Sequence, residues 1–140
     1  VPQSVFDGMA EGMRKDMRQF FKDFFKAFYG VGGPSAQASE AELEWAWMTS
    51  QMAGQYAVLQ AAKAFSTTDF RPDLASFNVP TLVIHGTGDD IVPIEITSRV
   101  VAERVPSARL IEYEGTPHAV FATDKDRLTR DLLDFLNSGS

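Results

Sequence analysis

A short, strongly apolar run at residues 81–85 limits what this chain can fold into. The run reads Thr-Leu-Val-Ile-His and ends at Gly86, a pattern typical of a strand buried on both faces of a parallel sheet. A second strand is predicted at residues 108–113. A helix is predicted between them at residues 94–105, because Pro93 stands where the first turn of a helix accepts proline.

These two strands cannot form a stable sheet by themselves. A parallel sheet needs cover on both faces and both edges, and the helix at 94–105 and a final amphipathic helix predicted at 124–136 supply only part of it. We therefore expect a partner that completes the sheet, either a further strand-rich segment or a second copy of this chain. The chain begins with Val1 and not with Met, so we expect it to begin inside a longer translated product or to follow processing.

The first part of the sequence is predicted to be helical. Apolar residues recur there at intervals of three and four, which is the period of an amphipathic helix. They are Phe6, Met9, Met13, Met17, Phe20, Phe24 and Phe28. Ser4 is the predicted N-cap of this helix, Gly30 is expected to end it, and a loop is expected at 33–38.

A second helical region follows this loop. Ser39 is its predicted N-cap, and Glu42 stands three residues later, where it can complete a capping box. The apolar periodicity continues to about Phe65, and Gly54 can divide the region into two helices.

The composition argues against several classes of function. The 140 residues include no cysteine and only two histidines, and the net charge is −6. We therefore expect no disulfide, no metal site and no nucleic-acid partner. No apolar stretch approaches the ~18 residues of a membrane span, and the first residues lack the features of a signal peptide, so no membrane partner is expected. The absence of cysteine fits a reducing compartment, and we expect a cytoplasmic location.

Candidate catalytic residues follow the two predicted strands. In an open parallel sheet, functional groups gather in the loops at the carboxyl ends of the strands, here 85–93 and 114–118. Asp89 and His118 can therefore meet although they are far apart in the sequence. A histidine that a carboxylate holds in one tautomer can act as a general base toward a hydroxyl. Asp90 is the rival for the acid role, and a turn-forming Asp beside a solvated His is the alternative without chemistry.

The segments around these residues resemble one group of hydrolases. Residues 79–86 (Val-Pro-Thr-Leu-Val-Ile-His-Gly), 88–89 (Gly-Asp) and 91–93 (Ile-Val-Pro) are similar to the acid loop of the cofactor-free haloperoxidase and aryl-esterase group of α/β-hydrolases. Glu114-Gly-Thr-Pro-His118 is similar to the histidine loop of that group. The resemblance implies an α/β fold, namely the C-terminal part of an α/β-hydrolase. In that fold a helical cap at 1–68 precedes a βαβα part of the core at 69–140.

The resemblance also implies roles for the residues of the two loops. Asp89 matches the acid of a Ser-Asp-His triad and His118 matches its base, whereas Asp90 falls on a variable position of the pattern. His85 belongs to the strand-end signature, and we interpret it as structural. Ala119 departs from the pattern, since a glycine is usual there.

The nucleophile of such a triad is missing from this sequence. The family carries it in a G-x-S-x-G turn between a strand and a helix, ahead of the cap. The nearest segment here is 33–37, Gly-Pro-Ser-Ala-Gln, which lacks the second glycine and a preceding strand. Ser35 is therefore interpreted as a loop serine, and the expected partner is an N-terminal half that supplies the serine.

The resemblance implies a serine hydrolase for small aryl or alkyl esters, with no cofactor. A perhydrolase activity is also implied, in which hydrogen peroxide replaces water and gives a peracid that oxidises halide. Lactam hydrolysis and C–C bond hydrolysis are related alternatives. Met9, Phe28 and Ile91 are the residues expected to form the wall of the substrate pocket. The alternative from another class is a non-catalytic, truncated or engineered fragment that self-associates through its open sheet edge.

Overall fold

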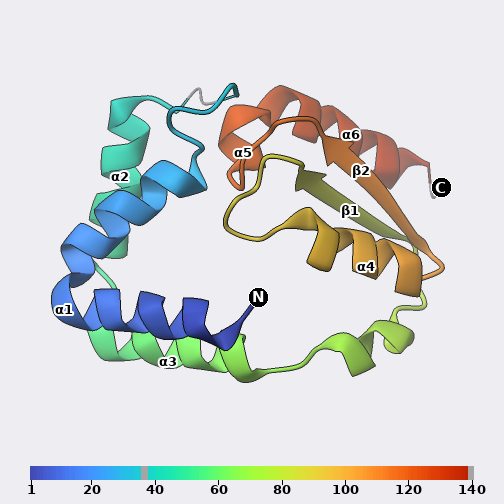
Figure 1. Cartoon of the computed structure of the whole chain (residues 1–140). Coiled ribbons are helices and arrows are strands. Elements are labelled where there is room, and N and C mark those ends of the chain that lie inside the picture. Colours follow the sequence, from blue (N-terminus) through green and yellow to red (C-terminus); the bar gives the residue numbers. More distant parts are fainter. Residues whose placement is uncertain (36–37, 139–140) are drawn as a thin grey trace. The chain divides into compact units, whose positions relative to one another are not determined.

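The computed structural model describes residues 1–35 and 38–138. Residues 36 and 37 of the predicted loop at 33–38 lie outside the described residues. Figure 1 labels the α-helices and the strands of the chain, and the 3₁₀ helices are denoted η. In chain order, the elements are α1 (Gln3–Phe28), α2 (Glu40–Ser50), α3 (Gln55–Thr67), η1 (Arg71–Ser76), β1 (Thr81–Gly86), η2 (Ile94–Ile96), α4 (Ser98–Arg104), β2 (Ala108–Tyr113), α5 (Val120–Thr123) and α6 (Lys125–Asn137).

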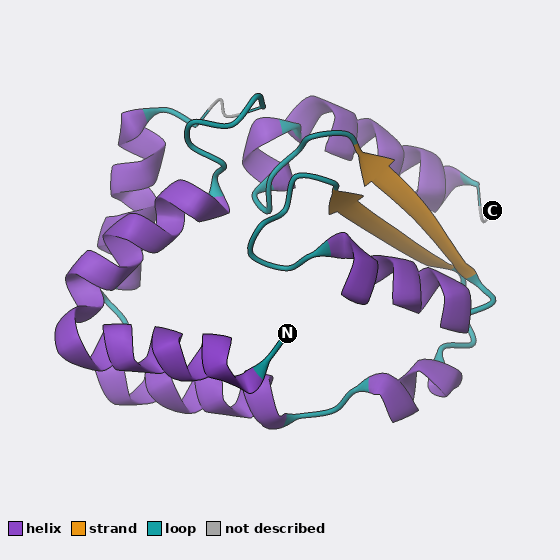
Figure 2. Ribbon diagram, viewed as in Figure 1, coloured by secondary structure: helices purple, strands orange, loops and turns teal. Residues whose placement is uncertain are grey.

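The chain divides into two compact units. One consists of residues 1–27 and 39–69, and the other of residues 28–38 and 70–140. The first unit contains helices and the second contains both strands, as the colours of Figure 2 show. Residues 28–38 follow the first helix but belong to the strand-containing unit. The assignment of residues 1–68 as a cap stays a prediction.

Helix α1 is kinked. Asp16 has non-helical backbone angles (φ −158°, ψ 92°), and its Oδ1 accepts a hydrogen bond from the backbone N–H of Gln19 at 2.9 Å. Asp16 thus acts as an internal N-cap for the second half of α1. A break of this kind leaves backbone carbonyls without a donor inside the helix. Near the kink, the carbonyl of Met13 accepts a hydrogen bond from the Gln55 side chain of α3 at 2.7 Å.

The predicted start of α2 is confirmed. Ser39 and Glu42 form a complete capping box, in which the Ser39 side chain accepts from the Glu42 N–H and the Glu42 side chain accepts from the Ser39 N–H. The division of this region near Gly54 is also confirmed, since Gly54 is the N-cap residue of α3. Trp47 joins α2 to α1 by donating its indole N–H to the carbonyl of Arg18 at 2.9 Å.

The predicted N-cap at Ser4 is wrong. Helix α1 already begins at Gln3, and the backbone N–H of Val5 donates to the carbonyl of Pro2 at 3.1 Å. Because Pro2 supplies the first carbonyl acceptor, Ser4 lies inside the first turn and not ahead of it.

Both predicted strands are confirmed, and they are parallel neighbours. The register runs from Thr81 opposite Ala108 to Gly86 opposite Tyr113. Figure 2 shows the two arrows pointing the same way. Helix α4 connects the strands along the chain and packs against both of them. The carboxyl ends of β1 and β2 therefore lie side by side, which is where the candidate site is expected.

The predicted single helix at 94–105 is wrong. The structure has η2 and α4, separated by Thr97 with φ −128° and ψ −90°. Ile94, Ile96 and Thr97 are β-branched and weaken the helical preference at this point. The Thr97 hydroxyl donates to the carbonyl of Pro93 at 2.8 Å.

The last helix is close to its predicted position at 124–136. It is α6, and it begins one residue later, with Asp124 at the N-cap position. The four-residue helix α5, which directly precedes it, was not predicted. The hydroxyl of the fully buried Tyr113 links β2 to α6 by donating to Asp131 Oδ2 at 2.6 Å.

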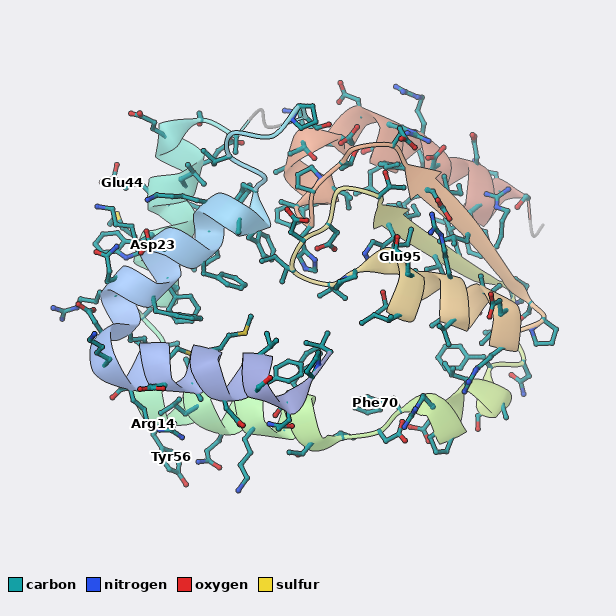
Figure 3. All side chains as sticks on the ribbon, in the orientation of Figure 1. Arg14, Asp23, Glu44, Tyr56, Phe70 and Glu95 are labelled. Carbon is teal, nitrogen blue, oxygen red and sulfur yellow. The ribbon has the colours of Figure 1, made fainter. Side chains whose placement is uncertain are left out.

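Large apolar side chains remain exposed around the strand-containing unit. Leu133 is 52% exposed and Leu136 is 69% exposed, although both belong to the strongly amphipathic helix α6. Phe70, labelled in Figure 3, is 60% exposed just before η1. The apolar faces of this unit are thus only partly covered within the described chain. None of the helices in residues 1–35 and 38–138 is long and apolar enough to cross a membrane.

Candidate active site

The loops that follow β1 and β2 are joined by hydrogen bonds through their main chains. The N–H of Thr87 donates to the carbonyl of Tyr113 at 2.9 Å, and the N–H of Gly88 donates to the carbonyl of Thr116 at 3.1 Å. The N–H of Gly115 donates to the hydroxyl of Thr87 at 2.8 Å. These bonds extend the register of the strands into the loops, so that the segments leading to Asp89 and His118 are held together.

Two glycines allow this close approach. A Cβ atom added to Gly86 would lie 2.0 Å from the carbonyl oxygen of Thr116. A Cβ atom added to Gly88 would lie 2.6 Å from the carbonyl oxygen of Gly115. Both distances are far below van der Waals contact, so neither position accepts a side chain without movement of the backbone.

Asp89 is the central residue of the site. It is 7% exposed. Its Oδ1 accepts hydrogen bonds from the backbone N–H groups of Ile91 at 2.9 Å and Val92 at 2.8 Å. A buried carboxylate requires donors of this kind, because burial without them is costly. The turn 89–92 therefore fixes one carboxylate oxygen and leaves Oδ2 to face other partners.

His118 is bound to the other oxygen of Asp89. Its Nδ1 lies 2.7 Å from Asp89 Oδ2. Because an ionised carboxylate only accepts hydrogen bonds, Nδ1 carries the proton, and the neutral ring has its lone pair on Nε2. The side chain of His118 is 32% exposed, whereas that of Asp89 is 2% exposed. This arrangement matches the orienting acid and the base of a nucleophile-activating triad.

Phe28 packs against the His118 ring. The ring centroids are 4.6 Å apart in an edge-on arrangement, and the carbonyl of Phe28 accepts the N–H of Ala119 at 3.1 Å. Gly30 has φ +66°, and a Cβ atom there would lie 2.7 Å from Pro117. The segment 28–30 therefore lies directly against the histidine loop, within the strand-containing unit.

The remaining candidates are placed as follows. Asp90, the rival acid, is exposed to solvent next to the buried Asp89. Ile91 is half-buried, and its backbone N–H supports the carboxylate of Asp89. Met9 lies in α1 within the helical unit and is half-buried. The roles of Met9, Phe28 and Ile91 as pocket wall, and the catalytic roles of Asp89 and His118, stay predictions.

One contact of the site was not predicted from the sequence. His85, which was interpreted as structural, places Nε2 3.0 Å from Asp89 Oδ2. The four-residue spacing between His85 and Asp89 did not predict it, because a residue near the end of a strand and a residue beyond the following turn have no fixed separation.

Comparison with known proteins assigns the chain to a family. A model of the alpha/beta hydrolase fold matches residues 48–125, more than half of the chain. The chain belongs to the alpha/beta hydrolase family. The predicted fold class is thereby confirmed. The strands and loops that carry Asp89 and His118 lie within the matched segment.

The similar proteins include haloperoxidases and an esterase. The chain is 37% identical over 139 residues to a non-heme chloroperoxidase of Kitasatospora aureofaciens, covering 98% of this chain and 50% of that protein. It is 40% identical over 111 residues to a bifunctional esterase/perhydrolase of Acinetobacter calcoaceticus, covering 79% of this chain and 40% of that protein. A bromoperoxidase structure from Bacillus anthracis superposes with a TM-score of 0.93 at 32% identity, covering 98% of this chain and 50% of that one.

These matches also show how much of the relatives' length the chain covers. The chain spans about half the length of the relatives it matches. The resemblance to the haloperoxidase and esterase group is confirmed, and the chain corresponds to the C-terminal part of these proteins.

Proposed function

We propose that this chain supplies the acid and the base of a serine hydrolase for small aryl or alkyl esters. The observation that carries the proposal is the 2.7 Å contact between His118 Nδ1 and the buried Asp89 Oδ2. It leaves Nε2 as the free basic nitrogen of a partly exposed ring. The names of the relatives, which include an esterase/perhydrolase, support this reaction class.

In this proposal the nucleophile comes from an N-terminal half with a G-x-S-x-G turn. The relatives, of which this chain covers about half, are long enough to carry such a half. His118 Nε2 takes the proton of the serine hydroxyl while the oxygen attacks the ester carbonyl. The protonated ring then gives this proton to the leaving alkoxide, and Asp89 Oδ2 stabilises the charge on the ring. Water, activated by the same nitrogen, releases the acid and restores the serine.

Perhydrolysis uses the same residues. Hydrogen peroxide takes the place of water, and one of its oxygens forms the new bond to the acyl carbon. The serine leaves as before. The product is a peracid. It oxidises halide in a separate reaction in which the triad takes no part. We further propose that the working protein is cytoplasmic and that Met9, Phe28 and Ile91 form its acyl pocket.

A pair of substitutions tests the acid assignment. The protein to use is the completed one, meaning this chain preceded by an N-terminal half that carries the serine. Asp89→Asn keeps the shape but removes the charge that holds His118, and kcat for a chromogenic aryl ester should fall by about 10⁴, as it does in serine proteases. Asp90→Asn is the matched control and should change kcat less than about threefold, since an exposed carboxylate contributes little. A large loss from Asp90→Asn with an active Asp89→Asn would contradict the assignment.

A further inference from the structure

His85 has three polar neighbours at the end of β1. Its Nδ1 lies 2.6 Å from the hydroxyl of Ser98, and its Nε2 lies 2.8 Å from the carbonyl oxygen of Val92. The same Nε2 lies 3.0 Å from Asp89 Oδ2. The His85 side chain is 11% exposed and Ser98 is 8% exposed. A nearly buried imidazole is thus placed between the acid turn and the start of α4.

The partners of His85 determine its tautomer. The Val92 carbonyl can only accept a hydrogen bond, so Nε2 carries the proton and donates it. In the neutral ring Nδ1 is then the acceptor, and the Ser98 hydroxyl donates to it. The Val92 carbonyl therefore decides which nitrogen of His85 is protonated, and Ser98 holds the ring in place from the other side.

His85 also closes the turn that holds Asp89. It binds the carbonyl of Val92, and the N–H of the same residue donates to Asp89 Oδ1. Asp89 Oδ2 meanwhile lies between two histidine nitrogens, His118 Nδ1 at 2.7 Å and His85 Nε2 at 3.0 Å. Any rotation of the carboxylate toward or away from His118 changes its contact with His85.

We propose that His85, with its tautomer set by the Val92 carbonyl and its ring held by the hydrogen bond from Ser98, is a positioning residue for the acid. It holds the 89–92 turn and the Asp89 carboxylate in the orientation that aims Oδ2 at His118. The inference rests on the proposed function, in which Asp89 orients His118. His85 does not touch the serine or the substrate in this mechanism, so it acts on turnover only through Asp89.

A double-mutant cycle with Asp89 tests this role in the completed protein. His85→Phe keeps a ring of similar size but removes both nitrogens. We expect a loss in kcat of about 10- to 100-fold, which is the effect of displacing a catalytic group by about 1 Å, with KM nearly unchanged. In the Asp89→Asn background the same substitution should lower kcat by less than about threefold, because the interaction it serves is already lost. Equal losses in both backgrounds would overturn the proposal.

Two further variants separate positioning from a general effect on folding. His85→Gln restores a donor toward Val92 and should recover a large part of the kcat lost in His85→Phe. Ser98→Ala should lower kcat, whereas Ser107→Ala makes the same change at an exposed serine and should leave kcat unchanged. Failure of His85→Gln to recover activity, in a protein that melts at the wild-type temperature, would count against the role.

Proton NMR separates this inference from the proposed function. The His118 Nδ1 proton, bound to a carboxylate at 2.7 Å, should give a low-field signal that disappears in Asp89→Asn. We expect His85→Phe to shift or broaden this signal and Ser107→Ala to leave it in place. If the completed protein hydrolyses no ester but the signal depends on His85, the proposed function fails and the positioning role stands. An unchanged signal in His85→Phe overturns the positioning role whatever the activity.

Discussion

At the scale of single residues, the site depends on two glycines that allow the main chains of the two loops to approach each other closely. Gly86 and Gly88 lie opposite the carbonyl groups of Thr116 and Gly115, at separations that leave no room for a Cβ atom. Because the two loops lie so close together, the short side chain of Asp89 is long enough to reach His118. The pair is therefore set by backbone geometry as much as by the two side chains themselves.

Gly86→Ala should disrupt the site through this contact. The added methyl group would lie 2.0 Å from the Thr116 carbonyl oxygen, so the histidine loop has to move. We expect a loss of stability of about 1–3 kcal/mol and a strong loss of ester turnover. Gly8→Ala is the control, because nothing lies within 4 Å of its added Cβ. In a helix this change should stabilise by up to about 1 kcal/mol, and urea unfolding measures both variants.

Tyr113 should make the folding stability of the protein depend on pH in the alkaline range. Burial, together with the hydrogen bond to Asp131, raises the pKa of Tyr113 from 10.0 to about 12. The folded protein thus keeps a proton that the unfolded chain loses, so this contribution to stability is present below pH 10 and is lost between pH 10 and about 12. Tyr113→Phe should lose less stability across that interval than the wild type does. Identical pH profiles from thermal unfolding would contradict this expectation.

At the scale of elements, the sequence predicted those helix and strand boundaries that interactions between neighbouring residues determine. The capping box at Ser39 and the apolar run of β1 were readable because neighbouring residues decide them. The kink at Asp16 had a readable signal as well, since Asp16 with Gln19 three residues later has the spacing of a capping pair. The long apolar stripe of α1 concealed it. The break at Thr97 had only a weak local signal, the β-branched residues around it. The contact of His85 with Asp89 depends on the tertiary arrangement of β1 and the following turn and had no comparable signal.

The two serines near helix starts should differ in their effect on stability. Ser39→Ala removes the side chain that accepts the Glu42 N–H and should cost about 1 kcal/mol. Ser4→Ala makes the same change inside the first turn of α1 and should be neutral or slightly stabilising. Chemical unfolding of both variants, followed by circular dichroism, makes the comparison. A larger cost at Ser4 would mean that the sequence-based N-cap was correct after all.

At the scale of the whole molecule, the chain leaves much of its apolar surface uncovered. Within residues 1–35 and 38–138 the outer edges of the two strands pair with no further strand, and apolar residues of α6 such as Leu133 and Leu136 are exposed. Exposed apolar surface usually marks an interface where it is contiguous. The prediction of an incomplete sheet thus agrees with the match to about half the length of the relatives. The identity of the completing segment could not be predicted from these residues, because an open edge pairs with any suitable strand.

Completion of the sheet by a partner should be detectable by mass spectrometry and by the binding of a hydrophobic dye. We expect the isolated chain to bind a hydrophobic dye strongly, and an N-terminal half supplied separately to form a one-to-one complex that suppresses this binding. Native mass spectrometry distinguishes this complex from a self-associated fragment, whose masses would be multiples of 15.5 kDa. A stable monomer that binds little dye would contradict the expectation of a completing partner.

The hydrogen bonds between the two loops have a consequence for how such an enzyme can be divided. The bonds described around Asp89 and His118 all come from residues 28–30 and 85–119, within one compact unit. If a protein of this family were divided ahead of this segment, the Asp89–His118 pair would stay together in one piece. Under the proposed function, reassembly would then have to align only the serine hydroxyl with His118 Nε2. Under the proposed function, such a piece would suit one half of a split reporter, whose signal would measure the docking of the serine.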